Sequence, residues 1–109
     1  MNRLKILLKA NVIDQEIYDT CSKIESDCKN WPQDDKERFI THLAMALSRI
    51  KKGEKVDPMS PMIANELKSN QNFNEAETNL KEMLIDFDYP IVEDEKMYLM
   101  LHILNNFNN

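Results

Sequence analysis

Glycine occurs only once in the 109 residues of this chain, and proline occurs four times. A sandwich or barrel of many short strands needs many tight turns, which glycine supplies most readily. Loops that cradle phosphate through their backbone amides also need several glycines. The sequence is instead rich in Leu, Met, Glu and Lys, which favour helix. We therefore predict an all-α protein without a glycine-rich phosphate-binding loop.

The length of the chain predicts a single domain over residues 1–109. The formal net charge is −5, and no run of Lys and Arg is longer than Lys51-Lys52. Direct nucleic-acid binding is not expected, because it normally needs a clustered basic face. No stretch of about 20 apolar residues is present to span a membrane. The N-terminal apolar run is too short and interrupted for a signal peptide, so we expect a cytoplasmic protein.

Apolar residues that recur every three or four positions predict amphipathic helices along most of the chain. A short helix is compatible with residues 4–10. The main helices are expected over about residues 14–30, 34–52, 60–70 and 74–87 and from 93 past 102, with an Asn-rich tail that frays. Asp14, Asp34 or Asp35, and Ser60 are suited to begin helices, and Gly53 to end one. The predicted fold is a compact bundle of about five helices.

Cys21 and Cys28 lie seven positions apart on one predicted helix. They would stand about 10 Å apart along its axis, too far to form a disulfide. We expect two reduced, buried thiols on the packed face. A zinc site that uses both thiols and a histidine is the alternative, but the spacing differs from the usual short ligand pairs. We therefore expect no metal and no cofactor.

The chain contains only two histidines, His42 and His102, and both lie in apolar helical segments. Imidazole titrates near neutral pH and can act as a nucleophile, a proton carrier or a metal ligand. A structural role on a packed helix is the alternative for each of them. The sequence contains no recognisable catalytic triad, metal motif or cofactor motif, so a histidine acting as a general base in an enzyme is not expected.

Residues three, four or seven positions away share a helix face with each histidine. The face of His42 carries Arg38, Met45, Ala46 and Arg49, and that of His102 carries Glu95, Tyr98, Asn105 and Asn106. The two arginines could hold an added anion by bidentate hydrogen bonds, or they could form a solvated helix flank. The acidic run at residues 93–95 is interpreted as compensation of the helix dipole.

These two histidine segments resemble the paired signatures of the PTS regulation domain, the PRD of bacterial transcriptional antiterminators and activators. The first signature is carried by His42-Leu43-Ala44, Ala46-Leu47, Arg49-Ile50 and Lys52-Gly53-Glu54. The second is carried by Glu93-Asp94-Glu95, Tyr98-Leu99 and Leu101-His102-Ile103. Between them, Pro61, Phe73-Asn74-Glu75-Ala76 and Leu80 also fit the family pattern. The resemblance covers about residues 14–105.

The resemblance implies an all-helical regulatory module that is phosphorylated on histidine and has no catalytic residues. HPr or a sugar-specific enzyme IIB of the phosphotransferase system would donate the phosphate. His42 and His102 match the two phosphoacceptor positions of the family. By the same resemblance, Arg49 would steady the charge around His42, and Glu95 would orient the site or oppose the phosphorylated state. PRDs generally pair, so a homodimer is expected.

One departure from the antiterminator pattern is that the residues before Asp14 are too few for a nucleic-acid-binding module. We therefore expect a stand-alone PRD that regulates transcription, antitermination or sugar uptake through a protein partner, such as another PRD-containing regulator. The alternative is a helical protein–protein interaction module that works without phosphorylation. In that case both histidines would be structural.

Overall fold

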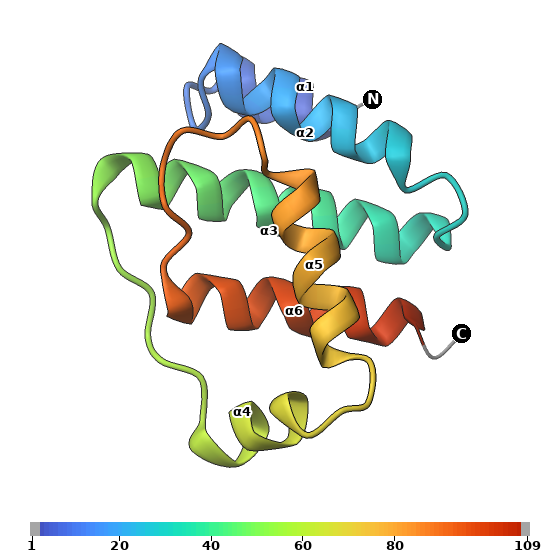
Figure 1. Ribbon diagram of the computed structural model, residues 1–109. Helices are drawn as coiled ribbons and strands as arrows, with labels where there is room; N and C mark the ends of the chain where they lie inside the picture. The colour runs from blue at the N-terminus through green and yellow to red at the C-terminus, as the bar shows by residue number, and fades with distance from the viewer. Residues whose placement is uncertain (1–2, 108–109) are drawn as a thin grey trace. The chain divides into compact units, whose positions relative to one another are not determined.

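The computed structural model describes residues 3–107, which form six α-helices and no strand (Figure 1). The helices are α1 (Arg3–Lys9), α2 (Gln15–Asp27), α3 (Gln33–Lys52), α4 (Pro61–Lys68), α5 (Phe73–Met83) and α6 (Glu93–Phe107). The all-α prediction is confirmed. The helix count exceeds the expected five by one, because residues 3–9 form a helix of their own. The predicted domain also included residues 1–2 and 108–109, which lie outside the described part.

The chain divides between Glu54 and Lys55 into two compact units. In the first unit, α1, α2 and α3 pack against one another. In the second unit, α6 packs against α4 and α5. None of the helices formed by residues 3–107 combines the length and the apolar character needed to traverse a bilayer.

In the first unit, polar contacts join the first turn of α2 to the last turns of α3. The Lys51 ammonium contacts the Asp14 carboxylate at 2.8 Å and also contacts Glu16. The Ser48 hydroxyl donates a hydrogen bond of 2.8 Å to the Val12 carbonyl oxygen, just before α2. Because the start of α2 meets the end of α3, the two helices run antiparallel, as Figure 1 shows.

These ion pairs change the acidity of the groups that form them. Hydrogen bonds to Asp14 and then Glu16 raise the pKa of Lys51 to about 12. Burial alone would raise the pKa of Asp14, but the hydrogen bonds from Lys51 and the Ile17 N–H outweigh burial and lower it. The charged forms of both partners are therefore favoured at neutral pH, so α2 and α3 are joined by an intact ion pair.

Several helix ends occur where the sequence places them. The Asp14 side chain accepts a hydrogen bond of 2.9 Å from the Ile17 N–H and so caps α2. Gly53 ends α3 with φ of 73°, the left-handed conformation that glycine adopts without steric cost. Ser60 precedes α4 and Pro61 occupies its first turn. These local signals were sufficient because each cap involves only neighbours in the sequence.

Two helices begin slightly before the expected residues. α3 begins at Gln33 rather than after a cap at Asp34 or Asp35, because the preceding proline already has a fixed φ suited to a helix start. The two aspartates instead lie in the first turn, where the helix dipole favours negative charge. α5 begins at Phe73, one residue before the predicted Asn74.

The core of the first unit consists of the apolar stripes predicted for α2 and α3. Buried side chains include Ile13, Ile17, Cys21, Ile24, Cys28, Phe39, Leu43, Ala46 and Leu47. The Phe39 ring is 0% exposed and lies 5.0 Å from the Trp31 ring, measured between centroids. This aromatic pair therefore holds the α2–α3 turn against the core.

Both cysteines are free thiols in this core, as predicted. Burial, with a smaller contribution from Glu25, raises the pKa of Cys21 to about 12. Burial, followed by the charge of Asp27, raises that of Cys28 to about 11. An unfolded thiol ionises near pH 8.5. The protonated thiols therefore contribute stability that is fully present below pH 8.5 and is lost as the pH rises toward the folded values.

We predict that the free energy of unfolding falls between pH 8.5 and 10 by about 1.4 kcal/mol per pH unit for each thiol. Urea unfolding followed by circular dichroism at several pH values would measure this slope. The Cys21→Ala/Cys28→Ala double variant should show a flatter profile over the same interval. An equal slope in both proteins would mean that the thiols do not cause the loss.

In the second unit, α6 supplies more of the core than any other helix. Its buried side chains are Glu95, Met97, Leu99, Met100, Ile103 and Leu104. The helix packs against α4 and α5, whose own buried side chains are Leu67, Ala76 and Leu80. The helix continues to Phe107, so the predicted fraying does not apply to residues 105 and 106, and the last two residues of that tail lie outside the described range.

Candidate functional site

His42 lies in the middle of α3 with an exposed side chain. Its neighbours Phe39 and Leu43 are buried, so His42 lies at the edge of the stripe of α3 that faces the core. Arg38, one turn before His42, forms an ion pair of 3.6 Å with Asp35. The imidazole is therefore held on a long helix at a position exposed to solvent.

Arg49 also lies on α3, seven positions after His42, and is half-buried. Seven residues correspond to two turns, so both side chains share one face about 10 Å apart along the axis. Arg38 and Arg49 thus flank His42 on the same side of α3. Both guanidinium groups therefore belong to the same helix face as the imidazole.

His102 lies in α6 and is half-buried, so it is less accessible than His42. One turn earlier, the Tyr98 hydroxyl donates a hydrogen bond of 3.2 Å to the Asp57 carbonyl oxygen. This bond attaches the loop before α4 to the face of α6 that carries His102. His102 is therefore less exposed than His42, and the loop before α4 is bonded to its helix face.

Asn106 follows His102 by one turn and folds back toward it. Its Nδ2 donates a hydrogen bond of 3.0 Å to the backbone carbonyl of His102. Its Oδ1 is buried and has no hydrogen-bond partner among the described residues. An acceptor in this state is unusual, because most buried polar atoms are paired.

Glu95 differs from its two acidic neighbours. Glu93 and Asp94 are exposed in the first turn of α6, where they suit the helix dipole as predicted. Glu95 is 1% exposed, so dipole compensation alone does not describe its setting. The sequence carries a signal for this burial, because Glu95, Leu99 and Ile103 recur every four positions along the buried stripe.

Lys96 is a charged residue near this site that the sequence did not single out. Its ammonium contacts Glu77 of α5 at 2.7 Å and Glu93 at 3.0 Å. Burial would lower the pKa of Lys96, but the hydrogen bonds to Glu77 and Glu93 outweigh it and raise the pKa. The hydrogen bond from Lys96 also lowers the pKa of the Glu77 carboxyl. Lys96 therefore fixes the start of α6 against α5.

The structure places the four predicted site residues in two pairs, each on one helix. His42 and Arg49 belong to α3 in the first unit, and Glu95 and His102 belong to α6 in the second unit. Each supporting residue lies two turns from its histidine. Each histidine therefore shares a helix face with its predicted supporting residue.

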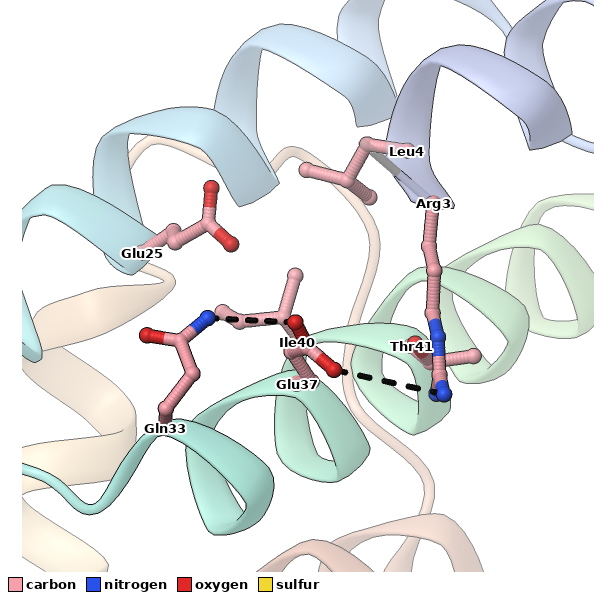
Figure 2. A pocket seen from close by; sticks show the side chains of 7 residues that line it. All are labelled: Arg3, Leu4, Glu25, Gln33, Glu37, Ile40 and Thr41. Carbon is pink, nitrogen blue, oxygen red and sulfur yellow. Dashed lines mark hydrogen bonds and ion pairs between the residues drawn. The ribbon is translucent and has the colours of Figure 1, made fainter. Parts of the chain in front are cut away.

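Two clefts among the described residues of the first unit are lined without any predicted site residue. The cleft in Figure 2 has a volume of about 220 Å³, and Glu37 at its side contacts Arg3 at 4.0 Å and Gln33 at 3.1 Å. It is lined by Arg3, Leu4, Glu25, Gln33, Glu37, Ile40 and Thr41. The second cleft, of about 240 Å³, lies beside Lys51. His42 lines neither of these two clefts and is exposed on α3.

Groups of three or more His, Cys, Asp or Glu side chains that could hold a metal ion do not occur within residues 3–107. A neutral imidazole has one nitrogen with a free lone pair, which can accept a proton or a transferred group.

Comparison with known protein families matches residues 14–106 to the family described as PRD domain. No curated protein and no solved structure matches the chain. The matched range includes α2 to α6 almost completely and contains both histidines. PRDs are regulatory domains controlled by the phosphotransferase system, and they are not a catalytic family. With more than half of its length matched, the chain belongs to the PRD family.

Proposed function

We propose that this PRD is phosphorylated on His42, His102 or both by HPr or an enzyme IIB of the phosphotransferase system. Its phosphorylation state would regulate transcription, antitermination or sugar uptake through a protein partner. The observation that carries the proposal is the family match over residues 14–106, which contains the only two histidines of the chain. The exposure of His42 on a rigid helix supports it further.

Phosphorylation would change the charge of this face strongly. A phosphoryl group on a side chain adds about −1.5 to −2 charges at pH 7 and three acceptor oxygens. The formal charge of the whole chain is −5, so each event changes it by about a third. We propose that Arg49 steadies the added charge at His42, and that Glu95 orients the second site or opposes phosphorylation there.

Such a change in charge suits a switch between protein–protein contacts. Negative charge recruits arginine side chains and repels acidic surfaces, so it can shift a dimer interface or release a partner. We propose a cytoplasmic homodimer that exchanges contacts with another PRD-containing regulator or a transporter component. The negative net charge favours a protein partner over nucleic acid.

The test is incubation of the full chain with phosphoenolpyruvate, enzyme I and HPr, with and without enzyme IIB proteins. Intact-protein mass should increase by one or two acid-labile phosphoryl groups. Arg49→Ala should slow labelling of His42 by about tenfold, the effect of losing one charge-assisted contact in the transition state. Lys52→Ala is the matched control, because it removes a positive charge from an exposed position in the last turn of α3, ten positions from His42. Equal labelling rates in the two variants would remove the role of Arg49.

The second candidate is an interaction module that works without phosphorylation. It is favoured by the exposed apolar side chains of α4, where Met62 is 77% and Ile63 is 45% exposed. Apolar side chains grouped on a surface helix are typical of protein contacts. Under this alternative, replacing both histidines by alanine leaves partner binding intact, whereas under the main proposal it abolishes the regulated change in binding.

A further inference from the structure

The unpaired acceptor beside His102 needs a physical explanation. Asn106 Oδ1 is buried without a hydrogen-bond donor within residues 3–107, while the other end of the same amide is fixed to the His102 carbonyl. A leucine at this position would avoid the unmet acceptor and would also favour helix more than asparagine does. The buried Oδ1 of Asn106 is explained if a hydrogen-bond donor reaches it in another state of the protein.

The His102 imidazole is placed to supply that donor. Residues four apart on a helix have Cβ atoms about 5–6 Å apart, and side chains lean toward the preceding turn. The bond of 3.0 Å from Asn106 Nδ2 to the His102 carbonyl holds the amide close to the backbone of that turn. The ring nitrogen nearer to the backbone is Nδ1. The amide oxygen is therefore within the range of an N–H on Nδ1 after rotation of the ring.

We propose that Asn106 is a positioning residue for phosphorylation of His102. Its Oδ1 accepts a hydrogen bond from Nδ1–H of the phosphorylated imidazole, so that Nε2 is the nitrogen that carries the phosphoryl group. This inference rests on the proposed function, and it adds the residue that selects the nitrogen at the second site. The bond on one ring nitrogen fixes which tautomer the other nitrogen presents.

The step balances without a further reactant. The lone pair on Nε2 attacks the phosphorus of a phosphorylated donor, which forms the N–P bond. The bond between phosphorus and the donor's leaving atom breaks, and its electron pair stays with the donor. The proton on Nδ1 remains on the ring, which becomes a phosphoimidazolium. This charged N–H is a stronger donor than the neutral one, so the bond to Asn106 Oδ1 strengthens as the phosphoryl group arrives.

The first experiment uses potassium phosphoramidate, a small chemical donor that needs no partner protein, on the full chain. Labelling of His42 in the same molecules is the internal reference. Asn106→Leu should lower the rate at His102 relative to His42 by about tenfold, the loss of one charge-assisted hydrogen bond. Asn105→Leu is the matched control, because Asn105 is the exposed neighbour. The unphosphorylated Asn106→Leu protein should melt about 4 °C higher than the parent.

The second measurement needs no variant. Nitrogen-15 spectra of the phosphorylated parent should show phosphate on Nε2 of His102 and a slowly exchanging proton on Nδ1. Phosphate on Nδ1, equal labelling ratios in the two leucine variants, or no labelling of His102 by phosphoramidate would each overturn the role of Asn106. If phosphoramidate gives the expected pattern but HPr and enzyme IIB never label the protein, this inference stands and the proposed function fails.

Discussion

Replacing Phe39 by alanine should lower the free energy of unfolding by about 3–5 kcal/mol. Phe39 is 0% exposed and its ring packs against Trp31 in the core of the first unit. Removing the ring loses its transfer free energy and leaves a cavity that the antiparallel α2–α3 pair cannot fill completely. A domain of this size is stable by only about 5–15 kcal/mol, so the loss is a large fraction of the total.

Urea unfolding followed by circular dichroism measures this difference directly. The control is Ile85→Ala, because Ile85 is 77% exposed and its truncation should change stability by at most about 0.5 kcal/mol. Trp31, the single tryptophan of the chain, additionally reports on the first unit by fluorescence. A loss below about 1 kcal/mol in Phe39→Ala would show that this ring is not an anchor of the core.

Replacing His42 by alanine should lower the initial rate of phosphate incorporation from the phosphotransferase relay by about tenfold, whereas His102→Ala should change it less. His42 is exposed on α3, and His102 is half-buried on α6. A donor protein must bring its phosphorylated residue within reach of the acceptor nitrogen. Reaching His102 first requires local opening, and each 1.4 kcal/mol of opening costs about a factor of ten in rate.

Quenched time points and peptide-level mass spectrometry at neutral pH, where phosphohistidine survives longest, would separate the two sites. Circular dichroism of both alanine variants controls for loss of fold. Faster labelling of His102 than of His42 would contradict the order derived from exposure. It would mean that the donor recognises the α6 face in preference to the open α3 face.

Much of the fold could be predicted because its signals are local. The stripe Ile17, Cys21 and Ile24 follows directly from the helical repeat, and all three side chains are buried. Asp14 and Gly53 mark helix ends through interactions with their nearest neighbours in the sequence. Such features depend on spacing and on the conformational preference of one residue, so a single sequence contains them.

Contacts between distant residues were not predictable in the same way. Lys51 lies in the last turn of α3, where the helix dipole favours cations, yet it pairs with Asp14, 37 positions away. Tyr98 bonds the carbonyl of Asp57, 41 positions away. The helical repeat of apolar residues contains no signal for either pairing, because each pairing depends on which segments lie close together in the fold. The division of the chain after Glu54 depends on the same kind of contact.

The candidate site was predictable to a similar extent. Its two histidines stand out because the chain has no others, and the order of the signatures identified the family. The burial of Glu95 could have been predicted from its place in the α6 stripe, although the acidic run around it favoured the dipole interpretation. The lack of a hydrogen-bond donor to Asn106 Oδ1 among the described residues could not have been predicted, because it depends on the positions of all the atoms around that oxygen.

The most direct measurement of the central claim is site-resolved phosphorylation of the full chain by phosphoenolpyruvate, enzyme I, HPr and enzyme IIB proteins. The account predicts an acid-labile phosphoryl group on His42, on His102 or on both, and none on the folded His42→Ala/His102→Ala double variant. A protein that acquires no phosphate from any of these donors, while a known PRD in the same reaction is labelled, would contradict it.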